Sequence, residues 1–169
     1  MSNLSLVTTP NRPDTDTEVV LEGIDYPFIE PGQYEACMVS YETSTRFAKK
    51  VPGDSSHMKG GKIYAHFRID PLNNAGLGNE ELIVFMSFNA MTIKRPFGRN
   101  GKFTAARRGN YGKLMRRFFG TEESTGSTPN ALKDKLFIVS VRTVEKDEKQ
   151  RSLRKEEIYS VIDEILDYA

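Results

Sequence analysis

Apolar and polar residues alternate in four stretches of the chain, and this period of two is typical of β-strands. The clearest stretch is residues 62–70, where one face carries Ile63, Ala65, Phe67 and Ile69 and the other carries Tyr64, His66 and Arg68. Residues 33–43, 81–91 and 135–146 follow the same pattern, and residues 157–169 fit either a fifth strand or a closing helix. The predicted fold class is therefore mostly β.

The strand predicted at residues 33–43 is apolar on both faces. Its alternating sets are Tyr34, Ala36 and Met38 on one side and Cys37, Val39 and Tyr41 on the other. We therefore expect both of its faces to be covered by other parts of the chain.

One short helix is predicted at residues 111–119, between the third and fourth strands. Asn110 is a suitable N-cap, and Gly120 can end the helix in the left-handed conformation. Its apolar stripe consists of Leu114, Met115, Phe118 and Phe119. We expect the two phenylalanines to pack in the core rather than to contact a ligand.

The connections between these elements are predicted from their glycine, proline and asparagine residues. Residues 44–61 are expected to form a long loop with turns at 52–53 and 60–61, and residues 71–80 a Gly/Asn-rich turn. The chain between the third strand and the helix is expected to be irregular, apart from a tight turn at Asn100-Gly101.

Composition divides the chain into two parts. Residues 1–30 contain six acidic residues and one basic residue, Arg12, which predicts an acidic, flexible and partly disordered N-terminal tail. Within this tail, residues 19–21 and 26–29 are apolar enough to dock on the domain. Residues 31–169 are predicted to form a single domain, since 169 residues suit one core with some tail.

Several classes of protein are disfavoured by composition and motifs. No apolar run approaches the roughly 20 residues of a membrane span, and the N-terminus lacks the pattern of a signal peptide. The single cysteine, Cys37, indicates a reducing compartment, so a cytoplasmic protein is expected. With two histidines and neither a P-loop nor a nucleophile elbow, the sequence predicts no enzyme, no metal and no cofactor.

Charge is distributed unevenly although the net charge is only +1. Residues 82–121 contain nine lysines and arginines and no aspartate or glutamate. Removing these nine from the 24 basic residues of the chain leaves 15, against 23 acidic residues elsewhere. An acid-free stretch of this length indicates a surface that binds a polyanion.

Aromatic residues are interleaved with these cations, which is the combination that holds a single nucleic-acid strand by phosphate contact and base stacking. The acid-free segment supplies ten candidate contacts: Lys94, Arg95, Phe97, Arg99, Lys102, Phe103, Arg107, Arg108, Tyr111 and Lys113, with Arg116 as an eleventh. The predicted strands supply Lys62, Tyr64, His66, Arg68 and Phe85, and the loop after the first strand supplies Arg46, Phe47, Lys49 and Lys50. For the strand and the loop, an ordinary polar exterior and a solvated loop are equally good interpretations.

The order of three strands, a helix and two further strands resembles the OB-fold, a five-stranded antiparallel barrel. The motifs Pro31-Gly-Gln-Tyr-Glu-Ala, Lys62-Ile-Tyr-Ala-His-Phe-Arg-Ile and Lys135-Leu-Phe-Ile-Val-Ser-Val-Arg are similar to those of small single-stranded-DNA-binding proteins of phages, plasmids and integrative elements. The resemblance covers about three quarters of the chain. It implies an OB-fold-like barrel with one short helix between strands three and four.

The same resemblance implies non-sequence-specific binding of single-stranded DNA in replication, recombination or transfer of a mobile element. RNA is the alternative ligand, and homo-oligomers and replication or recombination proteins are the expected partners. A structural or adaptor protein of a phage or secretion assembly, with a charged surface for a protein partner, is the competing interpretation.

Overall fold

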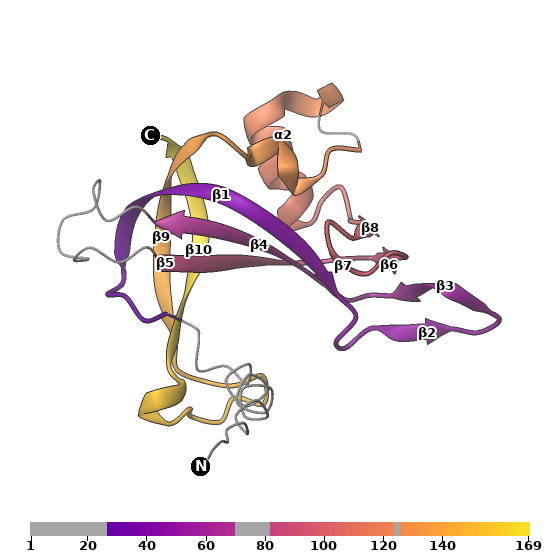
Figure 1. The fold of residues 1–169 in the computed structure, drawn as a ribbon, viewed down its shortest axis with the longest axis horizontal. Helices are drawn as coiled ribbons and strands as arrows, with labels where there is room; N and C mark the ends of the chain where they lie inside the picture. The colour runs from indigo at the N-terminus through magenta and orange to yellow at the C-terminus, as the bar shows by residue number, and fades with distance from the viewer. Residues whose placement is uncertain (1–26, 70–81, 124–125) are drawn as a thin grey trace, which may run out of the picture.

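The computed structural model describes residues 27–69, 82–123 and 126–169, and it is mostly β, as predicted (Figure 1). Most of the N-terminal tail and the turn predicted at 71–80 lie outside the described residues. The strands are β1 (Gly32–Ser44), β2 (Lys49–Val51), β3 (Asp54–Lys59), β4 (Lys62–Ile69), β5 (Leu82–Asn89), β6 (Thr92–Lys94), β7 (Gly98–Arg99), β8 (Lys102–Thr104), β9 (Leu136–Val144) and β10 (Tyr159–Tyr168). The described helices are α2 (Asn110–Glu123) and the short 3-10 turns η2 (Pro129–Leu132) and η3 (Lys155–Glu157).

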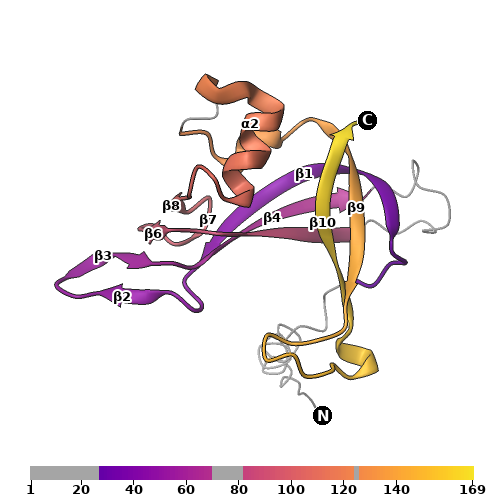
Figure 2. The same cartoon turned by 180° about the vertical axis from the view of Figure 1, so that it is seen from behind.

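The main sheet is antiparallel, with the strand order β10-β9-β1-β4-β5 and with β7 paired to β1. The ambiguous residues 157–169 supply a strand, β10, rather than a helix. Strands β9 and β10 run across the direction of β1, β4 and β5, which is clearest from behind (Figure 2). Strand β10 approaches β5, but no ladder joins them among the described residues. A closed five-stranded barrel is therefore not confirmed.

One face of the main sheet forms the core. The four apolar side chains of β4 predicted to share a face, Ile63, Ala65, Phe67 and Ile69, are all 0% exposed. Helix α2 covers this core with buried Leu114 and Met115, and Phe118 and Phe119 pack partly buried against it, as predicted. Gly120 has φ 77°, so the regular helix ends there as expected.

Strand β1 departs from the predicted alternation at a bulge. Its pairing with β4 shifts between Met38 and Ser40, which moves one residue out of register. Tyr41 is consequently buried on the same side as Ala36 and Met38, whereas the sequence pattern placed it on the opposite face. A bulge inserts one residue into a strand and so reverses the parity that follows it.

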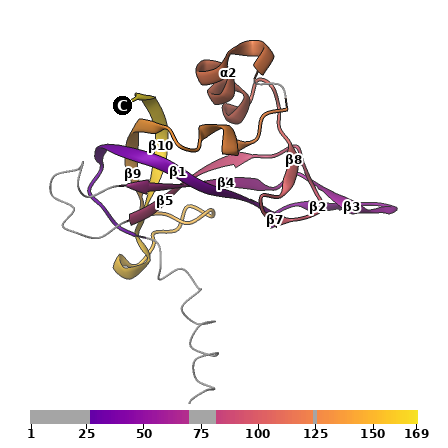
Figure 3. The same cartoon turned by 45° about the horizontal axis from the view of Figure 1, so that its top comes forward.

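A second sheet stands where the sequence predicted a long loop and irregular chain. Strands β2, β3, β6 and β8 pair in that order, and all of their ladders are antiparallel. Residues 44–61 thus form mostly a hairpin, β2–β3, which projects away from the main sheet (Figures 1 and 3). Three of the four strands have only three residues each, too few for a periodic pattern to be recognised.

The end of the N-terminal tail docks on β10, as predicted for residues 26–29, of which 27–29 are described. Ile29 is buried, its N–H donates to Ser160 Oγ at 2.9 Å, and that hydroxyl donates to the Ile29 carbonyl at 3.0 Å. The Ser160 N–H donates to the Pro27 carbonyl. The core of the domain therefore includes a residue that precedes Pro31.

Two adjacent glycines connect the sheets, and we expect them to differ in their tolerance of alanine. A Cβ at Gly61 would lie 2.7 Å from Ile93 Cγ1 and 2.7 Å from the Ser44 carbonyl, at φ +111°. Gly60 also has positive φ, +80°, but its Cβ would meet open space. Urea denaturation should show Gly60→Ala losing about 1 kcal/mol through backbone conformation and Gly61→Ala at least about twice as much. Equal losses would contradict the close approach at Gly61.

Candidate nucleic-acid interface

The face of the second sheet opposite Ile93 and Met58 carries four lysines. Directly opposed residues on antiparallel strands share a face, and so do residues two apart on one strand. Lys49 opposes Lys59, and Lys94 opposes Lys102, while His57 opposes Lys94 and lies two residues from Lys59. These pairings place Lys49, Lys59, Lys94 and Lys102 on one surface, here called the lysine face.

The lysine face is electrostatically unbalanced. No ion pair joins its four lysines to an acid anywhere in the described ranges. The acid on the hairpin, Asp54, pairs instead with His57, with 2.7 Å between Oδ2 and Nδ1. Lys94 and Lys102 are like charges directly opposite each other, an arrangement that destabilises a sheet. Repulsion between lysines that no nearby acid offsets indicates a surface that binds an anion.

A cavity of about 780 Å³ continues the lysine face towards α2. Lys94, Lys102 and Thr104 line it from the sheet, and Arg107 and Arg116 line it from the following connection and helix. Tyr41, Phe103, Tyr111 and Met115 add its apolar walls. None of its described lining residues is acidic. We call this space the helix-side cavity, and it brings together the cations of both β6–β8 and α2.

One of the two arginines at this cavity, Arg116, is held by the fold. Arg116 donates a hydrogen bond to the Arg107 carbonyl, which fixes its guanidinium beside the connection that leads into α2. A guanidinium has five N–H donors, so most remain for a ligand. A Cβ at Gly112 would lie 2.4 Å from the Arg107 carbonyl, so only glycine permits this approach of the connection to the helix.

Two of the predicted stacking residues belong to the protein core instead. Tyr111 is 7% exposed, its ring packs edge-on against Phe88 and Phe103, and its hydroxyl donates to the Ser127 carbonyl at 2.6 Å. Burial raises its pKa above the usual value, so the hydroxyl is neutral. Phe103 is half-buried and packs edge-on against Tyr41. The helix-side cavity is the place where Tyr111 and Phe103 border open space.

The outer face of the main sheet holds the predicted strand residues together. His66 opposes Phe85 across the β4–β5 ladder, so these two side chains share a face with Tyr64 and Arg68, as predicted. Phe85 packs edge-on against Tyr64 and stacks on Tyr159 of β10, with ring centroids 5.4 Å and 6.1 Å apart. The aromatic rings of this face therefore pack first against one another.

Charges on this outer face are mixed. Glu42 of β1 opposes Tyr64 of β4 on one side and Arg99 of β7 on the other. An acidic side chain therefore lies between these two residues on the outer face. His66 Nε2 is 3.8 Å from a Glu42 carboxylate oxygen. Burial lowers the pKa of His66 although Glu42 opposes the effect, so the ring is neutral at pH 7. This surface is less suited to a polyanion than the lysine face.

Two exposed phenylalanines lie near the end of β1, each beside an arginine. Phe47 is 55% exposed with the Arg46 guanidinium 5.0 Å from its ring centroid, and Phe97 is 37% exposed with Arg95 at 5.8 Å. Gly98, next to Phe97, pairs with Thr43 of β1, close to the loop that contains Phe47. These rings are the aromatic surfaces most accessible for base stacking among the predicted residues.

The other predicted residues lie apart from these surfaces. Lys50 opposes Met58 and so points away from the lysine face, and Lys62 Nζ donates to Asn89 Oδ1 at 2.8 Å. Lys113 lines a second cavity, of about 380 Å³, together with Asp163 and Glu164, which pair with Arg142 and Arg117. Arg108 is exposed on the connection that precedes α2. The acid-free segment is thus divided among several places.

Sequence patterns did not place Lys59 and His57 at the candidate site, although both lie on the second sheet beside the predicted lysines. A weak signal was present in Thr92-Ile-Lys and Lys102-Phe-Thr, where one apolar residue lies between polar ones. Thr92-Ile-Lys pairs with both β8 and β3. Its register with β3 joins segments more than 30 residues apart and cannot be obtained from local alternation.

Neither a membrane-spanning helix nor a metal-binding cluster is found in the part of the chain that the structure describes. No helix there is long and apolar enough to cross a membrane. No group of three His, Cys, Asp or Glu side chains in the same residues could hold a metal ion. The chain matches no protein-family model, no curated protein and no solved structure. The geometry of the lysine face and the helix-side cavity is therefore the basis for a functional proposal.

Proposed function

We propose that this protein binds single-stranded DNA without sequence specificity. The observation that carries the proposal is the lysine face: four lysines share one surface of the second sheet and none has an acidic partner among the described residues. Such a surface follows the phosphates of a strand by charge, and phosphate contacts carry no sequence information. Binding of this kind would protect or present single strands in replication, recombination or transfer of a mobile element.

Single-stranded rather than duplex DNA is favoured by the aromatic side chains near the lysine face. Phe47 and Phe97 expose their rings beside arginines, and a ring stacks on a base only where the base is unpaired. The strand order β10-β9-β1-β4-β5, with α2 between β5 and β9, also supports an OB-like arrangement, in which the β2–β3 hairpin would border the binding surface.

A titration of fluorescent oligo(dT) at several salt concentrations tests the proposal. Four phosphate contacts predict a slope of about −3 for log K against log salt, since each contact to a single strand contributes about −0.7. Duplex DNA of the same length should bind more weakly because it cannot stack, and an RNA oligomer tests the alternative ligand. No binding at about 50 mM salt would reject the proposal and favour an adaptor with a charged protein-binding surface.

A further inference from the structure

The helix-side cavity differs from the lysine face in having apolar walls. Tyr41 and Tyr111 close it from the core side at 3% and 7% exposed, and their hydroxyls donate to the Gly101 carbonyl at 3.2 Å and the Ser127 carbonyl at 2.6 Å. Phe103 is half-buried and is the most accessible of the three aromatic lining residues. Walls of this kind favour a flat apolar group.

Cations surround these apolar walls. Lys94 and Lys102 approach from the lysine face, and Arg107 and Arg116 from the helix side, with no acid among the described lining residues. A ligand that complements both features has a flat apolar part and a negative charge. A nucleotide unit of a single strand has both, and about 780 Å³ lies within the range of cavities that enclose small ligands.

We propose that the helix-side cavity receives one unstacked nucleotide of the bound strand, with its base against half-buried Phe103 in the apolar wall and its phosphates on Lys102 and Arg107. This inference rests on the proposed function and deepens it. Lys94 and Lys102 belong to both surfaces, so a strand that follows the lysine face reaches the cavity without leaving positive charge.

Filling the cavity tests this assignment. Ala106 lines the cavity and its side chain is exposed, so Ala106→Trp adds a large side chain without opening the core. Two oligomers are compared, oligo(dT) and an oligomer with the same phosphates in which every position is abasic. We expect Ala106→Trp to weaken oligo(dT) binding about 5- to 150-fold, the effect of one stacked base, and to leave binding of the fully abasic oligomer unchanged. Ala106→Leu should give an intermediate loss.

The matched control is Ser152→Trp, which adds the same side chain to an exposed position between β9 and β10, outside the cavity lining. It should change neither affinity. If Ala106→Trp weakened binding of both oligomers equally, the cavity would bind phosphate only. If it weakened binding of neither, the cavity would not contact the strand and would suit another anion such as an acidic peptide. Both results overturn the inference. Failure of the proposed function is distinct, because the unmodified protein would then bind neither oligomer.

Discussion

Replacing Lys94 and Lys102 together with alanine is expected to weaken oligo(dT) binding roughly 60-fold at about 50 mM salt and hardly at all at about 1 M salt. The reason is that each phosphate contact releases counterions, and the free energy of this release grows as the salt concentration falls. Removing two contacts should reduce the slope of log K against log salt by about 1.4 in magnitude. The measurement is a fluorescence titration of the variant and the unmodified protein over a salt series.

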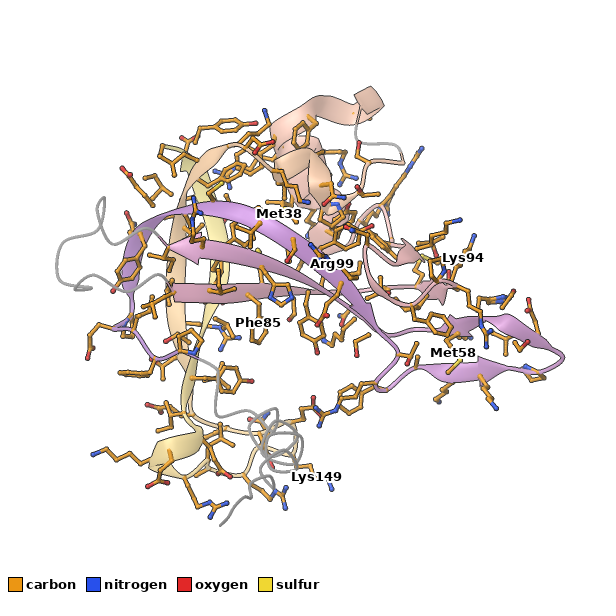
Figure 4. All side chains as sticks on the ribbon, viewed as in Figure 1. Met38, Met58, Phe85, Lys94, Arg99 and Lys149 are labelled. Atoms are coloured by element: carbon orange, nitrogen blue, oxygen red, sulfur yellow. The ribbon has the colours of Figure 1, made fainter. Side chains whose placement is uncertain are left out.

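Lys149→Ala combined with Lys155→Ala is the matched control. Both lysines are exposed and lie in the connection between β9 and β10, and Figure 4 shows Lys149 far from Lys94. This control removes the same total charge but should leave the salt slope almost unchanged. If the two double variants lose equal affinity, general charge rather than the lysine face would account for binding.

Stability should respond in the opposite direction to binding. Lys94 and Lys102 oppose each other as like charges, so the double alanine variant should be as stable as the unmodified protein or slightly more stable. Urea denaturation of both proteins measures this. Weaker binding without any loss of stability would separate a binding role from a structural one.

Much of the main sheet could be predicted from alternation, because its strands are long and one face is fully buried. Strand β4 has eight residues, and each of its predicted core side chains is buried. Long strands with one buried face carry a pattern that a random sequence would rarely produce. The end of the regular helix at Gly120 was similarly local, since a left-handed glycine ends a helix wherever the chain then leads.

The second sheet could not be predicted, because its short strands are defined by their pairing and not by a local sequence pattern. The triplet Thr92-Ile-Lys is a strand through its register with β3 and β8, which no local property of three residues determines. The bulge in β1 is a comparable case. Apolar side chains at both parities of this strand concealed the position at which its buried face changes.

The acid-free segment was correctly recognised as unusual, but its members take different parts in the fold. Arg117 donates to the carbonyls of Ile165 and Leu166, and it pairs with Glu164 at 3.5 Å, so it fastens α2 to β10. Tyr111 is a core residue. Lys94, Lys102, Arg107 and Arg116 line the helix-side cavity, and no acid lies among its described lining residues.

The largest loss of stability is expected from Phe67→Ala on β4. Phe67 is 0% exposed and packs edge-on against Phe137 of β9, with ring centroids 6.5 Å apart. Removing a buried phenylalanine leaves a cavity as well as losing apolar burial, which costs about 3–5 kcal/mol. That is a large part of the total stability of a small domain, so the midpoint of urea denaturation should fall steeply.

Ile83→Ala on the neighbouring strand β5 is the control for this substitution. Ile83 opposes Arg68 on the outer face and is 42% exposed, so its truncation should cost no more than about 1 kcal/mol. Phe67 opposes Val84, and Ile83 is the neighbour of Val84 on β5. Because neighbouring residues of a strand face opposite ways, the two substitutions together test the register of the sheet as well as its core. A larger loss from Ile83→Ala than from Phe67→Ala would place the core on the other face. The outer face with Tyr64, His66 and Phe85 would then be buried, and the assignment of exposed surfaces would have to be reversed.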